Sequence, residues 1–370
     1  MIRLPAVFRR ALPALGLYAG IRLLGLAVLA AWAGAEGRSP HQLLSARWDS
    51  LWYSDIARHG YFWPGYVASP HARGAGAHSH LAFFPMLPWL ERLLHAATGL
   101  SEPDAGLAVS AVASLAAALG IFAVGERVAG TRAATLLVVV WAALPIGVLQ
   151  SMAYTESLFT AFAAWALCCV LRERWVAAGV LASAAGLTRP SGAAVVAAVW
   201  AGVALGRGGG RWLGAAIAPL GLAGYVLWVG ARTGRGLAGY LRIQGDWGNG
   251  FDFGAAYGRF VWRQLTNSPG AGIGLLAFVA LVLWAYAACL RQRQPVPLLV
   301  YTGVIVAMSL GAQAYFNSKP RLLLPGFPLF LPLATWLATL RPRWTVALLT
   351  ALAAASAAYG ALWLLGPGPP

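Results

Sequence analysis

The chain has 370 residues, of which 59% are hydrophobic and only 10% are charged, and its formal net charge is +16. Soluble domains are about 25% charged, so this composition excludes an ordinary soluble protein. The positive charge could indicate a nucleic-acid partner, but the arginines are spread over short connections between apolar segments and form no basic stripe or reader motif. We therefore predict a membrane protein with no nucleic-acid partner.

Apolar segments recur from residue 11 to the C-terminus, and a membrane span needs about 20 apolar residues, so about ten or eleven transmembrane helices fit. The segments are 11–34, 105–125, 133–150, 155–171, 175–188, 191–206, 212–231, 271–290, 295–315, 322–340 and 344–365. The first is too long for the apolar core of a signal peptide and is predicted as a span. The pattern predicts an all-α polytopic membrane fold with one transmembrane domain over residues 1–370.

The arginines of the short connections predict the orientation of the chain. If Arg3, Arg9 and Arg10 hold the N-terminus in the cytoplasm, the short connections on that side carry more cations than those on the other side. The loops 35–104 and 232–270 then lie on the non-cytoplasmic side. We expect both loops to contribute to an active site on that face.

Most acidic residues lie in or at the edge of the first outer loop, so candidate general bases are few. They are Glu36, Asp49, Asp55, Glu91, Glu102 and Asp104. Asp49 begins an amphipathic run, 50–58, which predicts a helix along the membrane surface with the carboxylate facing the interface. Asp49 therefore has two readings, a general base and the N-cap of this helix, and both stay open.

Two interfacial helices are expected in this loop. In the first, Leu51, Trp52 and Ile56 share one face, and Asp55 is predicted as a solvated residue rather than a catalyst. The second follows the prolines at 85 and 88. Its expected apolar residues are Leu90, Leu93 and Leu94, and its polar ones are Glu91, Arg92 and His95.

Five motifs follow one another along the chain. They are Trp-Asp at 48–49, Ile-Ala with Gly-Tyr at 56–61, Phe-Phe-Pro at 83–85, Tyr-Thr-Glu-Ser at 154–157 and Thr-Arg-Pro at 188–190. In this order they resemble the PIG-V type mannosyltransferases of GPI-anchor synthesis and their bacterial relatives, which belong to the GT-C class. The resemblance implies a polyprenyl- or dolichyl-phosphate-mannose donor, inverting transfer, and a catalytic aspartate in the first outer loop, here Asp49.

The residues support a lipid-phosphate donor independently, because nucleotide sugars are cytosolic and the chain has no soluble nucleotide-binding domain. Glycosyl transfer needs a base for the acceptor hydroxyl, and Asp49 is the candidate. The departing phosphate needs cations at the membrane boundary, and Arg189, Lys319 and Arg321 are placed to bind it. The alternative is that these three side chains simply reach lipid headgroups.

Glu156 lies where a span re-enters the membrane, and a carboxylate at that depth is costly unless it is paired. It could hold the acceptor, or pair with Arg189 or Arg321, and structural pairing is favoured. Trp48 and Tyr154 beside these carboxylates are candidates for acceptor binding or structural support. Arg22 falls near the middle of the first span and should face the bundle, with a partner that the sequence does not identify.

No cofactor and no divalent metal is expected. All histidines lie in the first outer loop, without an Asp-x-Asp pair or helical His-x-x-x-His spacing. They are His41, His59, His71, His78, His80 and His95. The cysteines, Cys168, Cys169 and Cys289, lie in apolar segments and form no disulfide framework.

The sequence therefore predicts an inverting glycosyltransferase in a bacterial cell membrane. It would move a mannosyl or other hexosyl unit from a polyprenyl- or dolichyl-phosphate sugar to a hydroxyl of a glycolipid, polysaccharide or protein, on the non-cytoplasmic face. The alternatives are a transporter or flippase for a lipid-linked sugar and a noncatalytic subunit. Transporters carry ionisable groups at the midplane of broken helices, whereas here only Glu156 is immersed, so the enzyme is favoured.

Overall fold

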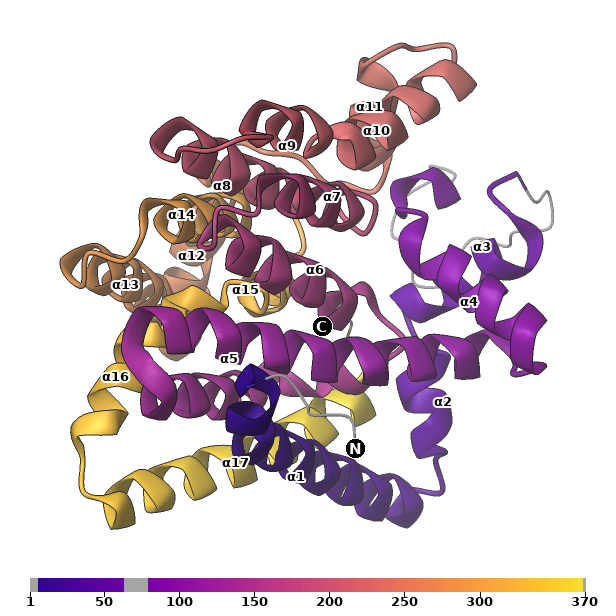
Figure 1. Cartoon of the computed structure of the whole chain (residues 1–370). Helices are drawn as coiled ribbons and strands as arrows, with labels where there is room; N and C mark the ends of the chain where they lie inside the picture. The colour runs from indigo at the N-terminus through magenta and orange to yellow at the C-terminus, as the bar shows by residue number, and fades with distance from the viewer. Residues whose placement is uncertain (1–5, 63–78, 369–370) are drawn as a thin grey trace.

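A computed structural model describes residues 6–62 and 79–368 as helices and their connections (Figure 1). The helices are α1 (Ala6–Ala35), α2 (Pro40–Ser45), α3 (Asp49–His59), α4 (Met86–Thr98), α5 (Glu102–Ala142), α6 (Thr155–Val170), α7 (Trp175–Gly186), α8 (Gly192–Leu205), α9 (Arg211–Ile217), α10 (Leu220–Arg232), α11 (Ala238–Asp246), α12 (Ala255–Asn267), α13 (Pro269–Arg291), α14 (Val296–Gly311), α15 (Lys319–Leu323), α16 (Leu331–Thr339) and α17 (Pro342–Leu365). Short 3-10 turns occur at η1 (His80–Ala82), η2 (Pro145–Ser151), η3 (Phe316–Ser318) and η4 (Phe327–Phe330). Every apolar segment predicted as a span lies on one or more of these helices, which confirms the all-α fold.

Within the described ranges, five helical stretches are long and apolar enough to cross a membrane: α1, α5, α9 with α10, α13 and α17. The number rises to seven if η2 with α6, bent by 93°, and the stretch from η3 to α16, bent by 81°, each form one broken span. The predicted spans 175–188, 191–206 and 295–315 are the shorter apolar helices α7, α8 and α14.

Two predicted spans, 105–125 and 133–150, are joined in α5. Gly130 has φ 82° and ψ 169°, which are not helical values, and the chain reverses there (Figure 1). A Cβ placed on Gly125 would lie 3.0 Å from the Cα of Ala134, so the two halves pack closely against each other. The second half ends at Ala142 rather than at residue 150, because Pro145 begins η2 and cannot continue the helical hydrogen bonds.

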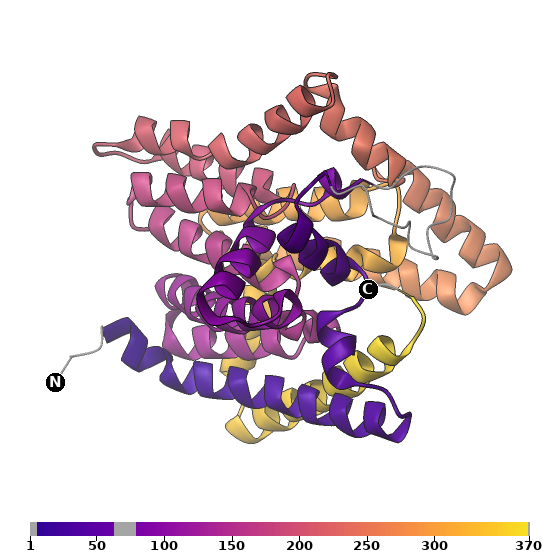
Figure 2. The ribbon, with the colours of Figure 1, turned by 90° about the vertical axis from the view of Figure 1, so that its right-hand side faces the viewer.

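The core helices approach one another through small residues. Helix α5 packs against α1, α6 and α16, and α6 packs in turn against α7 and α8 (Figures 1 and 2). At Gly120 of α5, an added Cβ would be only 2.9 Å from the Cβ of Ala164 on α6. Such close backbone approach is typical of helix packing in membranes.

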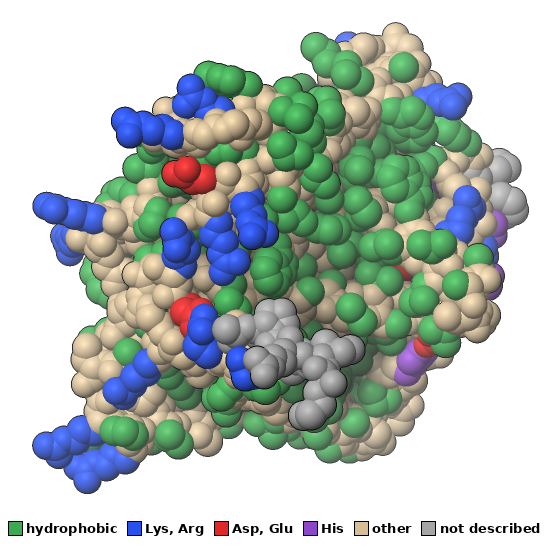
Figure 3. Space-filling view, viewed as in Figure 1, with side chains coloured by type: hydrophobic (Ala, Val, Ile, Leu, Met, Phe, Trp, Pro, Cys, Tyr) green, Lys and Arg blue, Asp and Glu red, His purple; other side chains and the backbone are tan. Residues whose placement is uncertain are grey.

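Arginines of the predicted cytoplasmic connections meet at one end of the bundle. Arg132 donates to Leu340 O (3.0 Å), Arg127 to Leu171 O (3.0 Å), and Arg10 pairs with Glu126 (2.7 Å). Figure 3 shows Lys and Arg side chains gathered toward the left-hand side, where α5 reverses and α16 meets α17 in Figure 1. Helices α2, α3, α4 and α11 lie at the right-hand end, which faces the viewer in Figure 2.

The two predicted amphipathic helices form as α3 and α4, but their faces differ from the prediction. In α3, Trp52 and Ile56 are buried while Leu51 is exposed. In α4, Glu91 is fully buried while Leu93 is 65% exposed, the reverse of the expected pattern. At a membrane boundary an exposed leucine can contact lipid. The positions of the apolar residues in α3 and α4 therefore did not predict which helix face packs against the rest of the protein.

Arg22 has partners that the sequence did not identify. Its Nη1 donates to Gly147 O and its Nη2 to Ala142 O. These carbonyls are free to accept because α5 ends at Ala142 and the chain turns into η2. The buried cation of the first helix is therefore balanced by backbone dipoles rather than by a carboxylate.

Candidate active site

Asp49 is the first residue of α3 and pairs with Arg321. Its Oδ2 lies 2.5 Å from Arg321 Nη2, and its side chain is 28% exposed. Its backbone N–H donates to the hydroxyl of Tyr154 (3.2 Å). Trp48, not Asp49, is the N-cap residue of α3, and it makes no side-chain cap bond, so the N-cap reading of Asp49 is wrong. The carboxylate is turned toward a cation instead of toward its own helix.

Trp48 sets the direction in which α3 begins. Its backbone has φ 51° and ψ −119°, a conformation that residues other than glycine rarely adopt. The guanidinium of Arg47 lies 4.0 Å above the Trp48 ring. Such sparsely populated conformations persist only where the surroundings enforce them, and they cluster at functional sites.

Glu156 pairs with two arginines. Arg321 Nε donates to Glu156 Oε1, and Arg189 Nη1 lies 2.9 Å from the same oxygen. Glu156 is fully buried, and the Arg321 guanidinium lies 4.6 Å over the Tyr154 ring. The pairing expected with either arginine thus occurs with both.

Four separate parts of the chain supply this cluster. Asp49 comes from α3, Glu156 from the first turn of α6, Arg189 from the α7–α8 connection and Arg321 from α15. Prolines at 190 and 320 adjoin the two arginines. Because proline restricts the residue before it and cannot continue an interior helical turn, these cations sit at breaks between helices rather than inside long spans.

The cluster balances two carboxylates with two guanidinium groups. Charges buried in this way are tolerated only when they are paired and hydrogen-bonded. Asp49 is the partly exposed end of the cluster and Glu156 its enclosed end. The arrangement leaves Asp49 able to meet a substrate, while Glu156 holds the two arginines.

Lys319 lies apart from these ion pairs. It is fully buried, and its Nζ donates to Ser309 O (2.7 Å) and Ala312 O (2.5 Å). The rings of Tyr257 and Phe316 lie 4.8 and 5.5 Å from the ammonium nitrogen. An ammonium has three N–H groups, so one remains for a ligand.

The exposed fractions of the three cations that we predicted to bind phosphate test the alternative that they reach lipid headgroups. Lys319 is fully buried, and Arg189 and Arg321 are each only 9% exposed. The alternative in which these side chains extend to lipid headgroups does not fit that burial.

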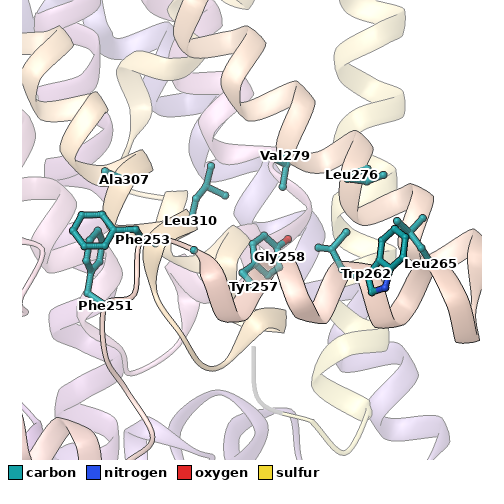
Figure 4. A pocket seen from close by; sticks show the side chains of 13 residues that line it. Phe251, Phe253, Tyr257, Gly258, Trp262, Leu265, Leu276, Val279, Ala307 and Leu310 are labelled. Carbon is teal, nitrogen blue, oxygen red and sulfur yellow. The ribbon is translucent and has the colours of Figure 1, made fainter.

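Two cavities adjoin the Lys319 region. One, of about 430 Å³, is bordered by Lys319 and by side chains of α13 and α17. The other, of about 520 Å³, lies among α12, α13 and α14 and is lined mostly by apolar side chains (Figure 4). In Figure 4, Phe251 and Phe253 lie at one side of this cavity and Trp262 and Leu265 at the other. Tyr257 lines both cavities.

The loop 232–270 is fastened to the first outer loop by aromatic side chains. Trp247 lies 4.7 Å from the Trp52 ring and donates to Ser79 O (3.3 Å). Trp52 in turn stacks on Phe83 at 5.4 Å. Because Trp52 is on α3, these contacts connect the second loop to the helix that begins with Asp49.

Sequence reasoning missed Tyr315 and Tyr53. Tyr315 has φ 49°, is 45% exposed, and donates its hydroxyl to Trp247 O (2.9 Å), just before the segment that carries Lys319. Tyr53, one turn after Asp49, is within 3.3 Å of Thr155 Oγ1, and burial raises its pKa. A tyrosine at a helical spacing of four from Asp49 was a readable signal; the conformation of Tyr315 was not.

Asp55 is held by two histidines. His80 Nε2 lies 2.7 Å and His59 Nδ1 3.0 Å from its carboxylate oxygens. Asp55 is thus a paired residue rather than the solvated one expected. Within the described residues, no group of three His, Cys, Asp or Glu side chains is arranged to hold a metal. His71 and His78 lie outside the described residues.

Comparison with known proteins identifies the fold. The family described as dolichyl-phosphate-mannose-protein mannosyltransferase matches residues 78–231. The structure is similar to ArnT from Cupriavidus metallidurans bound to undecaprenyl phosphate, with a TM-score of 0.55 and 15% identity over 90% of this chain. It is also similar to the archaeal oligosaccharyltransferase AglB from Archaeoglobus fulgidus, in complex with an inhibitory peptide and a dolichol-phosphate, with a TM-score of 0.51 and 12% identity over 95% of this chain.

The chain therefore has the fold of the GT-C membrane glycosyltransferases, which is a multi-pass membrane fold. It spans 62% of the length of the ArnT chain and 56% of the AglB chain. No curated protein sequence matched it.

Proposed function

We propose that this protein is an inverting glycosyltransferase that uses a polyprenyl- or dolichyl-phosphate sugar as donor and a hydroxyl compound as acceptor. The observation that carries the proposal is the ion pair of Asp49 with Arg321, which lies two residues along the chain from Lys319 and the cavity that Lys319 borders. The GT-C fold and the partial match to a mannosyltransferase family support it.

Asp49 acts as the general base. Its carboxylate takes the proton of the acceptor hydroxyl as the acceptor oxygen bonds to the anomeric carbon. The bond from that carbon to the phosphate oxygen breaks at the same time, and the lipid phosphate leaves with the electron pair. Attack opposite the leaving group inverts the anomeric configuration.

Arg321, Arg189 and Lys319 stabilise the charge that develops on the departing phosphate. Arg321 already contacts Asp49, so it can touch both the base and the leaving group. Lys319 supplies a buried point charge that no carboxylate pairs with among the described residues. Glu156 keeps the two arginines in place, and Trp48 and Tyr154 support Asp49 and Arg321. These roles require no divalent metal.

The apolar cavity among α12, α13 and α14 accommodates part of the isoprenoid chain. Phe251, Trp262 and Leu276 contribute to its lining, and Tyr257 joins it to the Lys319 side. A ligand with an anionic head and a long apolar tail fits a buried cation next to such a cavity. The undecaprenyl phosphate of the ArnT structure and the dolichol-phosphate of the AglB structure are ligands of this kind.

Mannose is the proposed sugar, and the non-cytoplasmic face of a bacterial cell membrane is the proposed site of reaction. The ordered motifs that resemble PIG-V type enzymes and the matched mannosyltransferase family support mannose. The Lys and Arg side chains gathered where α5 reverses (Figure 3), at the end of the bundle opposite α3 (Figure 1), support the orientation. The acceptor is a glycolipid, polysaccharide or protein.

The test is transfer by the purified protein. Polyprenyl-phosphate-mannose labelled in the sugar is supplied with a panel of glycolipid, polysaccharide and peptide acceptors, and with glucosyl and other hexosyl donors for comparison. We expect labelled product with the mannosyl donor and the inverted linkage. A protein that moves the labelled donor across a vesicle membrane without transferring its sugar would support the flippase instead.

A further inference from the structure

The C-terminal end of α17 lies against the first outer loop. The last carbonyls of a helix have no intrahelical donor and need other partners. Here Arg47 Nη1 donates to Leu364 O, Arg38 Nη1 to Leu365 O (2.6 Å) and Arg47 Nη2 to Gly366 O (2.8 Å). Two arginines from the first outer loop therefore satisfy three successive carbonyls at the end of the last helix.

Arg47 is also fixed through its backbone. Its N–H donates to Ser50 Oγ (2.9 Å), and its carbonyl accepts from the same hydroxyl (2.6 Å). Ser50 is fully buried. The side chain of Arg47 is thus held by α17, and its backbone is held by the first turn of α3.

Between these two anchors lies Trp48, whose backbone is strained. The Arg47 guanidinium covers the Trp48 ring at 4.0 Å while it binds the α17 carbonyls. Asp49 follows directly, so any rotation at Trp48 would swing the carboxylate away from Arg321. The Tyr154 hydroxyl at the Asp49 N–H holds one end of this stretch, and the contacts of Arg47 with α17 hold the other end.

We propose that Arg47 is a positioning residue for Asp49, and that the C-terminal end of α17 is the support on which the base is aligned. This inference rests on the proposed function, because it assumes that Asp49 is the base. The Gly366 carbonyl accepts from Arg47, and Gly366 also borders the cavity beside Lys319. The end of α17 therefore contacts both the residue that positions the base and the cavity next to a phosphate-binding cation.

Arg38 offers a matched control. It binds the same helix end through the Leu365 carbonyl, which lies between the two carbonyls that Arg47 binds. The carboxylate near Arg38 is that of Glu36, whose Oε2 lies 3.8 Å from Arg38 Nη1. Loss of Arg38 therefore removes a comparable anchor of α17 without touching Trp48 or Asp49. A difference between the two variants isolates positioning of the base from general attachment of the helix.

The experiment measures kcat, the donor KM and thermal unfolding for wild type, Arg47→Ala, Arg47→Lys and Arg38→Ala. Misplacing a reacting group by about 1 Å can cost about 10²-fold in rate. We expect Arg47→Ala to lower kcat by about 10- to 100-fold with the donor KM within about threefold of wild type. Arg47→Lys, which cannot bond both carbonyls with one planar fork, should recover only part of the loss.

Arg38→Ala should unfold at about the same temperature as Arg47→Ala but keep kcat close to wild type. Equal losses of kcat in the Arg38 and Arg47 variants would overturn the inference in favour of general anchoring. A raised donor KM with unchanged kcat would overturn it in favour of direct substrate binding. If Arg47→Ala does not fold, Arg47→Lys carries the same comparison. If wild type transfers no sugar from any donor, the proposed function fails and this inference falls with it.

Discussion

Arg321 and Asp49 are 272 positions apart in the sequence, yet the guanidinium of one bonds the carboxylate of the other. The same guanidinium donates from its Nε to the buried Glu156. One arginine thus links the partly exposed carboxylate to the enclosed one. This geometry is why the two carboxylates take different roles in the proposed reaction.

Replacing Arg321 should affect turnover more than membrane insertion. Arg321→Ala removes a cation from the leaving phosphate and the partner of Asp49, so kcat should fall by about 10²-fold or more. Arg321→Lys should recover only part, because an ammonium cannot bond Asp49 and Glu156 with one fork. The measurement is transfer at limiting and saturating donor, with membrane-inserted protein quantified in parallel. Activity of Arg321→Ala equal to wild type at limiting donor would remove this residue from the phosphate site.

Glu156→Gln should mainly lower stability. The change keeps the shape but leaves Arg189 and Arg321 with an uncompensated buried charge, and breaking a buried pair in this way costs about 3–5 kcal/mol. Thermal unfolding in detergent measures the effect. Glu126→Gln is the control, since Glu126 pairs with Arg10, whose side chain is 48% exposed, and the loss of that pair should lower stability much less. Equal effects of the two substitutions would show that the Glu156 pairs do not stabilise the fold.

The buried carboxyl of Glu91 should make the free energy of unfolding depend on pH. It is buried on α4, neither carboxylate oxygen has a hydrogen-bond partner among the described residues, and burial raises its pKa well above the ordinary value. The unfolded chain releases this proton near pH 4.3, whereas the folded protein keeps it, so folding loses stability as pH rises from there through the folded pKa.

Glu91→Gln mimics the neutral acid and should remove that loss. The thermal unfolding midpoints of variant and wild type should be similar at pH 4 and should diverge toward pH 8, with the variant more stable. The difference between their free energies of unfolding should grow by about 1.4 kcal/mol for each pH unit above the unfolded pKa, until the pH reaches the folded pKa. An unchanged gap between the two proteins across this range would mean that Glu91 is ionised in the folded state.

Labelling of single cysteines tests the orientation. In a background lacking Cys168, Cys169 and Cys289, a membrane-impermeant thiol reagent applied to intact cells should label His41→Cys and Leu237→Cys. It should leave Arg207→Cys unlabelled until the membrane is opened. Labelling of the first two positions from opposite faces would separate the two loops and remove the shared outer site.

The sequence was informative where a local pattern has one structural meaning. Apolar runs predicted the helices, and the expected pairing of Glu156 with Arg189 or Arg321 anticipated part of the cluster that the structure forms. Charged residues at span ends have few ways to be satisfied, so their pairing was predictable in kind.

Contacts that depend on tertiary packing could not be predicted from the sequence. The hydrogen bonds of Arg47 with the end of α17 join two distant parts of the chain, and no local sequence pattern predicts them. The contacts of Lys319 with carbonyls and aromatic rings were likewise not predictable, because the break after α14 brings Ala312 back to it. The α4 face was mistaken for a related reason, since lipid and protein interior attract the same leucines.

The substitution Asp49→Asn tests the central claim most directly. Asparagine keeps the size of the side chain and can still accept a hydrogen bond from Arg321, but it lacks the basic carboxylate that takes the acceptor proton. The variant should be expressed, insert and bind donor about as well as wild type, and its transfer rate should fall by about 10²-fold or more. A transfer rate within a few-fold of wild type would contradict the assignment of Asp49 as the base and would direct attention to Glu156.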